Sequence, residues 1–167
     1  TPSARHRDPT PSPVRTHTPA MRLELTKRGD YAVRAMLALA RGAGNGLLSA
    51  RRISDAMGIP VRFLPQVLAD LQRGGLVEAA PGRSGGYRLA RDASTISLLD
   101  VIEAVEGDSR RQSCVLRGGP CGTDGFCDVH EVFFEAQEAL RTHFAQSMLS
   151  DLAAPATGEA LLAVPEA

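Results

Sequence analysis

The feature that most constrains the fold of this chain is an ordered series of short amphipathic segments between residues 25 and 90. The first segment, LTKRGDYAVRAMLALAR at 25–41, predicts a helix with Thr26 as its N-cap and Gly42 just beyond its end. Its apolar residues near helical spacing, which we expect to face a core, are Leu25, Val33, Met36, Leu37 and Ala40. Further segments must complete that core.

Two more helices are expected after a glycine-rich loop. Ser49 is the predicted cap of a short helix that ends at Gly58. The residues expected to face inward from it are Ile53, Ala56 and Met57. The next helix lies within VRFLPQVLADLQRGG, where Pro65 is tolerable only because it falls near the first turn. Its apolar stripe consists of Leu64, Val67, Leu68 and Leu71. The residues expected on its opposite, polar face are Arg62, Gln66, Asp70 and Arg73.

Two helices joined by a glycine-containing turn are typical of a helix-turn-helix, whose second helix enters the DNA major groove by its N-terminal residues. Arg62 and Gln66 stand at that end. Arginine matches the paired acceptors of guanine, and glutamine matches the donor and acceptor of adenine, so both are suited to reading bases. The alternative interpretation is two solvated polar residues on an ordinary amphipathic helix.

The segment LVEAAPGRSGGYRLA at 76–90 has two strand-like runs around a turn rich in Pro and Gly, and it predicts a hairpin. A hairpin after a recognition helix is a wing. Arg83 stands at its tip, and Arg88 and Arg91 lie on the return, where they suit a minor groove or phosphates. The order of helix, helix and basic hairpin therefore favours nucleic-acid binding over arginines that only face solvent.

The net charge of zero conceals a basic half and an acidic half. Residues 26–91 contain eleven Lys and Arg against four Asp and Glu, a charge of +7, whereas residues 92–167 contain four against thirteen, a charge of −9. This division indicates one face for a polyanion and another for a different partner, with chance segregation of surface charge as the alternative. No apolar run approaches the roughly 18 residues needed to cross a bilayer, so no membrane partner is expected.

The acidic half begins with another helix. The segment SLLDVIEAVEG has Ser97 and Asp100 at capping-box spacing and Gly107 as the stop. One long helix is then expected from about Val129 to Leu152. Its apolar stripe consists of Val132, Phe133, Ala136, Leu140, Phe144, Met148 and Leu152. A small domain offers little surface to cover this stripe, so the same stripe on a second copy is its expected partner, and folding back on its own domain is the alternative.

All three cysteines of the chain, Cys114, Cys121 and Cys127, lie in CVLRGGPCGTDGFCDVH at 114–130. An odd number cannot pair fully within one chain, so metal ligation is the favoured interpretation of this cysteine triad. His130 follows one helical turn after Cys127 and can point to the same side. Three thiolates and one imidazole satisfy tetrahedral zinc as readily as an iron–sulfur cluster, although gaps of six and five residues are wider than most zinc sites use. Oxidation of two thiols to a disulfide, without metal, is a further alternative.

Four segments together resemble the winged-helix transcription regulators typified by IscR, NsrR and RirA, often called the Rrf-two family. They are LTKRGDYAVRAMLALA, GLVEAAPGRSGGYRLAR, ISLLDVIEAVEG and the cysteine loop, and the resemblance runs from Met21 to about Leu152. It implies an iron–sulfur cluster, [2Fe-2S] or [4Fe-4S], in the loop before the dimerisation helix. It also implies control of genes for cluster assembly, iron, or nitric-oxide and redox stress.

The resemblance assigns ligands by position. The cysteine triad matches the three cluster thiolates, His130 matches the histidine ligand of the IscR type, and Asp30 matches the aspartate ligand of the NsrR type. We therefore expect His130 as the fourth ligand, with Asp30 as the alternative. Pro65 and Pro81 depart from the charged residues that many IscR-like proteins carry there, which leaves the cognate DNA sequence open.

The sequence thus predicts a mainly α (α+β) chain, with a winged helix-turn-helix DNA-binding domain, a two-stranded wing and a long C-terminal dimerisation helix. The expected parts are a disordered tail at 1–20, the DNA-binding domain at 21–107, the cluster-binding loop at 108–128, the dimerisation helix at 129–152 and a disordered tail at 153–167. The expected function is a cytoplasmic, cluster-dependent transcriptional regulator, with repression as its expected sense. It would sense nitric oxide, redox state, or iron–sulfur and iron status.

We expect a homodimer on a pseudo-palindromic site in double-stranded DNA, and no enzymatic activity, since no nucleophile–base constellation is recognisable. The residues expected to contact DNA are Thr26, Lys27, Arg28, Arg51, Arg52, Arg62, Gln66, Arg83 and Arg88. The residues expected at the dimer interface are Val132, Phe133, Ala136, Leu140 and Phe144. The alternative functions are a zinc-binding or thiol-based redox-sensing winged-helix regulator and, less favoured, an iron–sulfur electron-transfer protein, which would leave the basic winged domain unexplained.

Overall fold

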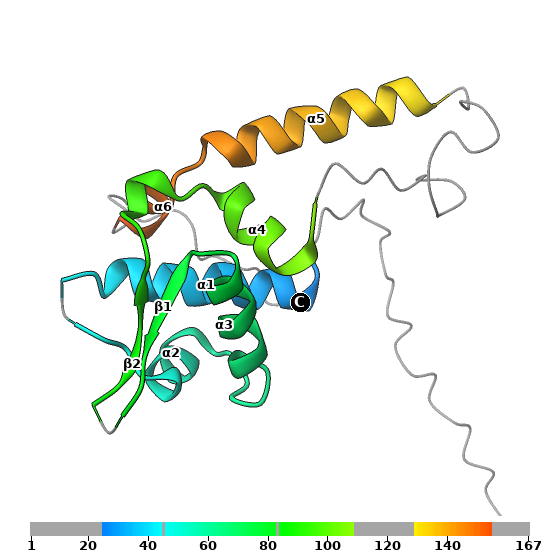
Figure 1. Cartoon of the computed structure of the whole chain (residues 1–167). Helices are drawn as coiled ribbons and strands as arrows, with labels where there is room; N and C mark the ends of the chain where they lie inside the picture. The colour runs from blue at the N-terminus through cyan, green and yellow to red at the C-terminus, as the bar shows by residue number, and fades with distance from the viewer. Residues whose placement is uncertain (1–24, 45, 83, 109–128, 155–167) are drawn as a thin grey trace, which may run out of the picture.

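The computed structural model of the chain describes residues 25–44, 46–82, 84–108 and 129–154. Its elements, in chain order, are α1 (Lys27–Arg41), α2 (Ala50–Met57), α3 (Leu64–Arg73), β1 (Val77–Ala80), β2 (Gly86–Leu89), the 3-10 helix η1 (Ala93–Thr95), α4 (Leu98–Glu106), α5 (His130–Gln146) and α6 (Leu149–Ala153) (Figure 1). The cysteine triad, Arg83 and the predicted tail at 1–20 lie outside the described residues. Of the predicted tail at 153–167, Ala153 belongs to α6 and residues 155–167 lie outside the described residues.

Helix α1 forms the centre of the fold, in contact with α2, α3, β2, α4 and α6. It begins as predicted at Thr26, whose hydroxyl accepts a hydrogen bond from the backbone N–H of Gly29 at 3.1 Å, and it is capped by Gly42. Its predicted core stripe is partly correct, because Val33, Leu37 and Ala40 are half-buried against the core, whereas Leu25 is exposed. The most deeply buried side chains are Ala32, Ala35, Met36 and Leu39. Of the predicted set only Met36 is fully buried, because elements pack on several sides of α1 and not along one stripe.

Helices α2 and α3 form the predicted helix-turn-helix. Ser49 caps α2 by accepting from the N–H of Arg52 at 3.3 Å, and Gly58 ends it in the left-handed conformation at φ 63°, which glycine adopts without steric cost. Ile53 is buried as predicted, but the prediction for Ala56 was wrong because that residue is exposed. Ser54 is buried instead, and its hydroxyl donates to the carbonyl of Ile59 at 2.6 Å.

Helix α3 packs its predicted apolar stripe into the core. Pro65 lies in its first turn, where a missing N–H leaves no intrahelical bond unmade. The buried members of the stripe are Leu64, Val67, Leu68 and Leu71. The prediction that Asp70 lies on the exposed face was wrong, because only 1% of its side chain is accessible. Two arginines and a glutamine surround its carboxylate, as described below.

The predicted wing is present as the antiparallel pair β1–β2, in which Val77 lies opposite Leu89 and Ala80 opposite Gly86. Leu48, in the loop before α2, pairs with Tyr87 through two backbone hydrogen bonds of 3.0 and 2.8 Å. A side chain at position 86 would place its Cβ 2.6 Å from the Leu48 carbonyl oxygen, so glycine is required for this close approach. The wing is therefore fastened to the loop between α1 and α2.

Helix α4 starts at the predicted capping box. The Ser97 hydroxyl accepts from the Asp100 N–H at 3.1 Å, and the Asp100 carboxylate accepts from the Ser97 N–H at 3.0 Å. Gly107 caps the other end. Together with the helix-turn-helix and the hairpin, this confirms the predicted fold class, a mainly helical winged helix-turn-helix with a long C-terminal helix.

The prediction of one continuous helix from Val129 to Leu152 was wrong, because the structure has α5 followed by the short α6. Two backbone hydrogen bonds of 2.8 Å, from Leu98 N–H to Ser147 and from Leu149 N–H to the Ile96 carbonyl, hold the break against the start of α4. Leu149 is fully buried, and α6 packs on α1. Helix α5 lies along α4 and runs beyond the rest of the domain (Figure 1). Among the described helices, none combines the length and the apolar character needed to span a bilayer.

Candidate nucleic-acid interface and cluster loop

The N-terminal ends of α1 and α3 meet around a depression of about 220 Å³. The residues that line it are Lys27, Arg28, Tyr31, Phe63, Gln66 and Val67. Three of these, Lys27, Arg28 and Gln66, were predicted from the sequence to contact DNA. The structure therefore brings together residues of the first and third helices on one face, as a groove-binding surface requires.

Two aromatic residues in this depression were missed by the sequence reasoning. The ring of Tyr31 stacks on that of Phe63, with centroids 5.8 Å apart, and the guanidinium carbon of Arg62 lies 4.7 Å from the centroid of the Phe63 ring. Arg62 is in the turn just before α3 and is exposed. Phe63 positions it through cation–π attraction, which is worth about 0.5–1 kcal/mol at an exposed site. An exposed phenylalanine beside an arginine was the signal available in the sequence.

The buried carboxylate of Asp70 connects α1 and α3 on this face. It forms ion pairs with Arg28 of α1 and with Arg73 of α3, and it accepts a hydrogen bond from Nε2 of Gln66 at 3.1 Å. Burial raises the pKa of Asp70, but the hydrogen bond and charge of Arg28, with the charge of Arg73 and the Gln66 hydrogen bond, outweigh burial and hold the pKa below its ordinary value. Asp70 is therefore ionised at neutral pH, and Arg28 engages it in the absence of DNA.

Arg51 of α2 and Arg88 of the wing also have acidic neighbours. Arg51 lies 3.9 Å from Asp55 on the same helix face. Across the wing, Arg88 donates from Nε and Nη2 to the Glu78 carboxylate at 2.8 and 2.7 Å. All of these side chains are largely exposed, so the pairs contribute little to stability and can exchange for phosphates.

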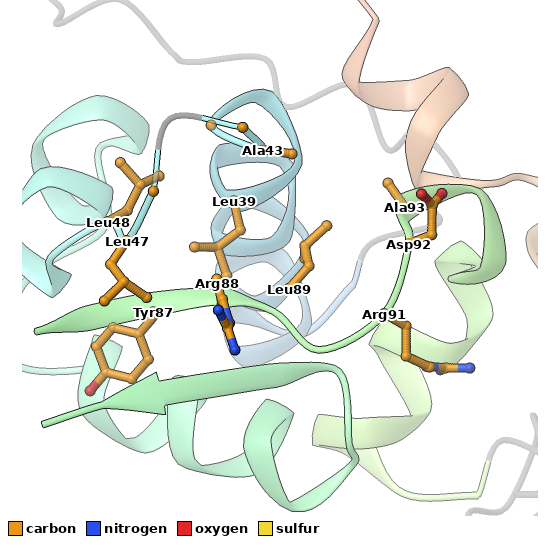
Figure 2. A pocket seen from close by; sticks show the side chains of 13 residues that line it. Leu39, Ala43, Leu47, Leu48, Tyr87, Arg88, Leu89, Arg91, Asp92 and Ala93 are labelled. Atoms are coloured by element: carbon orange, nitrogen blue, oxygen red, sulfur yellow. The ribbon is translucent and has the colours of Figure 1, made fainter.

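A second, larger pocket of about 450 Å³ lies behind the wing (Figure 2). Figure 2 shows side chains of α1, of the loop that ends at Leu48 and of β2 lining it. Most of the lining is apolar, including Leu39, Leu48 and Leu89. Arg88 and Arg91 are its basic members, and Arg91 also lies 3.9 Å from Asp100.

The loop that carries the cysteine triad joins the end of α4 to the start of α5, and the triad itself lies outside the described residues. The root of this loop contacts α1, because the hydroxyl of Thr26 donates to Glu106 at 2.6 Å. The two candidate fourth ligands stand at different places in the fold. His130 is the first residue of α5, with its ring stacked on Phe134 at a centroid distance of 6.1 Å. Asp30 is in the first turn of α1 and accepts from Arg34 at 2.8 Å.

Within the described ranges, no three His, Cys, Asp or Glu side chains converge to form a metal site. A cluster site in this chain would therefore need ligands from outside the described ranges, where the cysteine triad lies. Thiolates and an imidazole are the ligands that iron–sulfur centres take, so the donor set of the loop and His130 fits such a group. Asp30 lies on α1 and accepts from Arg34 through Oδ1, whereas His130 directly follows the loop.

The predicted dimerisation stripe stands on α5, where no residue is buried. Val132 is 67% exposed and Phe133 is 38% exposed. Arg141 of α5 forms an ion pair with Glu103 of α4 at 3.0 Å, and the stripe residues near it, Leu140 and Phe144, are half-buried. The N-terminal part of the stripe, Val132, Phe133 and Ala136, is exposed.

Comparison with known proteins identifies relatives along most of the chain. The family model Rrf2, described as an iron-dependent transcriptional regulator, matches residues 25–155. The HTH-type transcriptional regulator IscR of Klebsiella pneumoniae strain 342 is 35% identical over 130 residues, which are 78% of this chain and 79% of that protein. The corresponding IscR of Escherichia coli O1:K1 / APEC is 34% identical over 130 residues, 78% of this chain and 80% of its own length.

Solved structures agree in fold. The structure of T. potens IscR superposes with a TM-score of 0.63 at 27% identity, over 78% of this chain and 85% of that one. That of CymR, the global cysteine regulator of B. subtilis, superposes with a TM-score of 0.67 at 25% identity, over 79% of this chain and 97% of that one. These relatives are transcriptional regulators and not enzymes, as was predicted for this chain.

Proposed function

Because the chain belongs to the Rrf2 family of DNA-binding transcriptional regulators, we propose that it is a cytoplasmic homodimeric repressor whose DNA binding depends on an iron–sulfur cluster. The cluster is of the [2Fe-2S] or [4Fe-4S] type. The signal is nitric oxide, redox state, or iron–sulfur and iron status. The observation that carries the proposal is the placement of all three cysteines of the chain in the loop between α4 and α5, ahead of His130.

The residues that would hold the cluster are Cys114, Cys121, Cys127 and His130, with Asp30 as the alternative fourth ligand. A bound cluster supplies iron that changes its redox state or reacts with small oxidants and nitric oxide. Imidazole ligation in place of one thiolate raises the potential of such a centre and makes it sensitive to protonation. This would suit a sensor.

The described contacts supply a route from the loop to DNA. Glu106, two residues before the loop, accepts from Thr26, and Thr26 caps the helix that begins with Lys27 and Arg28. About three turns beyond His130, α5 is joined to α4 by the Arg141–Glu103 ion pair. A change in the loop that moves α4 relative to α5 would therefore act on the N-terminal end of α1, which lines the DNA-facing depression.

On DNA, we propose that α3 enters the major groove with Arg62 and Gln66 at the base edges, and that the wing contacts the minor groove or backbone through Arg83 and Arg88. The residues assigned to phosphates are Thr26, Lys27, Arg28, Arg51 and Arg52. The basic segment of +7 that contains them supports this assignment. The α5 stripe pairs two copies, so that two recognition helices address two half-sites.

The test begins with protein purified without oxygen. We expect brown protein with visible absorption, bound iron and acid-labile sulfide, and different affinities of the holo and apo forms for the protein's own promoter. Replacing any one of the three cysteines by Ser should abolish the cluster. Colourless protein that contains zinc, or metal-free protein that forms a disulfide on oxidation, would refute cluster dependence. The second of these outcomes would favour thiol sensing, to which the three cysteines in one loop and the structural likeness to CymR also lend support.

The fourth ligand is tested by three matched variants reconstituted separately. His130→Ala should change the cluster spectrum and shorten its lifetime in air. His143→Ala is the control, because it removes the histidine at the far end of α5. Asp30→Ala should leave the cluster unchanged. If only Asp30→Ala disturbs the cluster, the assignment of His130 is wrong.

A further inference from the structure

The side chain of Gln66 is held in one orientation by Asp70. Its Nε2 lies 3.1 Å from Oδ1 of Asp70, and the Asp70 side chain is 1% exposed whereas Gln66 is exposed. A carboxylate can only accept hydrogen bonds, so the amide nitrogen, and not the amide oxygen, must face it. The amide oxygen of Gln66 is therefore turned away from the buried carboxylate, toward the outer surface of α3.

Asp70 cannot readily turn away from this role. Its second oxygen pairs with Arg28, which is 42 residues away on α1, and Arg73 approaches from the next turn of α3. A buried charge is tolerated only when it is paired and hydrogen-bonded, and here both oxygens are engaged. The lowered pKa of Asp70 keeps the group ionised, so that it does not become a donor at neutral pH.

We propose that Asp70 is a positioning residue that sets the base preference of the recognition helix, an inference that rests on the proposed entry of α3 into the major groove. With its oxygen outward, Gln66 meets a base edge as an acceptor. It therefore selects a base with an exocyclic amino group in the major groove, adenine N6 or cytosine N4, and disfavours guanine O6 and thymine O4. The second N–H of the amide is available for adenine N7, which favours adenine over cytosine.

Without the hydrogen bond to Asp70, the Gln66 amide would not be restricted to one orientation toward the bases. An isolated glutamine can rotate its terminal amide by half a turn and present either oxygen or nitrogen. Asparagine at position 70 has one oxygen and one N–H₂ group in place of two oxygens, so it can present either to Gln66. The Gln66 amide is then no longer restricted to having its oxygen outward and can also turn its nitrogen toward the keto oxygens of guanine and thymine. The charge of Asp70 thus determines which class of base one operator position accepts.

The test is binding-site selection from a randomised duplex library, with the full-length protein in whichever cluster state binds DNA. For the unchanged protein we expect one position in each half-site at which adenine or cytosine is preferred over guanine and thymine by roughly 5- to 150-fold, the range for a good base contact. Gln66→Ala should remove the preference at that position only. Asp70→Asn should reduce it to less than about threefold or invert it, with the other positions unchanged.

A second variant keeps the inference testable if Asp70→Asn proves unfolded by circular dichroism. Gln66→Glu can only accept, so it should retain the preference for amino-bearing bases. A Gln66 that reads through its nitrogen would instead prefer guanine and thymine in the unchanged protein, and the same change would reverse that preference. Unaltered selectivity in Asp70→Asn, or loss of the amino-base preference in Gln66→Glu, overturns the role of Asp70. Selection that is unaffected by Gln66→Ala overturns it as well. If the unchanged protein selects no sequence in either state, the proposed DNA-binding function itself fails, and this inference fails with it.

Discussion

Replacing Phe133 by Ala should dissociate the proposed dimer while leaving the protomer folded. Phe133 is 38% exposed on α5. A phenylalanine buries about 200 Å² when fully covered, so dimer formation would cover roughly 75 Å² of this side chain in each copy. At about 25 cal/mol per Å², the change removes about 2 kcal/mol per copy and about 4 kcal/mol per dimer. The dimer dissociation constant should therefore rise by about three orders of magnitude.

The assay is sedimentation equilibrium, extended to nanomolar protein with a fluorescent label. Phe134→Ala is a matched control, because Phe134 has the same 38% exposure but lies two turns before Arg141, on the side that faces α4. It should shift the dissociation constant by less than about tenfold. Equal effects of the two variants would refute the assignment of the interface to the stripe. A dimer of Phe133→Ala as tight as the original would refute it too.

Three further changes probe the DNA face and the fold. Arg62→Ala should weaken specific DNA binding by roughly 1–3 kcal/mol in fluorescence anisotropy and relax base preference at one position; unchanged affinity would show that Arg62 reads no base. Ser97→Ala breaks the capping box of α4 and should lower the free energy of unfolding by about 1 kcal/mol in urea titration. An unchanged free energy of unfolding would mean that tertiary contacts, and not the cap, stabilise the start of α4. Because the pKa of Asp70 is lowered on folding, its charge stabilises the fold above the ordinary value of 3.8, and this contribution is lost as pH falls through the lower folded pKa. Asp70→Asn should therefore lose less stability than the original protein as the pH falls below about 4, and parallel curves would contradict this.

Helix ends were predictable from the sequence because they depend on neighbouring residues. A serine or threonine hydroxyl reaches an N–H only two or three residues on, so Thr26, Ser49 and Ser97 were recognised correctly as caps. The same holds for the left-handed end of α2 at Gly58. The hairpin was also local, since its turn residues lie between its two strands.

Features that depend on distant residues were missed. Asp70 fits the polar face of α3 by its spacing, and its burial follows from Arg28, 42 residues earlier. The stripe after Val129 continues through Met148 and Leu152, so its periodicity gives no sign of a break. The break arises because the chain at Met148 pairs with Ser97 at the start of α4.

The candidate site divides in the same way. The cysteine triad could be predicted as a ligand set because thiolate chemistry is a property of the residues themselves, and it stays a prediction because the triad lies outside the described residues. The depression between α1 and α3 could not, since the Tyr31–Phe63 stack joins residues of different helices. Which of His130 and Asp30 serves as fourth ligand remains a prediction, because it depends on how the loop meets α1 and α5.

Helix α5 can act as a lever arm, because the break between α5 and α6 is hydrogen-bonded to the winged domain. Its C-terminal end is held to the winged domain by the two backbone hydrogen bonds at Ser147 and Leu149, and its other end begins at His130 beside the cysteine loop. A helix of 17 residues is about 25 Å long, so a swing of about 5° about the fixed end displaces the free end by about 2 Å. The relation also runs in reverse. If a second copy binds the N-terminal part of α5, the same rotation of about 5° moves the winged domain relative to α5. In a dimer with two-fold symmetry, the two winged domains would rotate in opposite directions. In such a dimer, the distance between the two recognition helices has to match about 34 Å or a multiple of it on DNA. A displacement of a few ångströms at the free end of α5 would then change that distance.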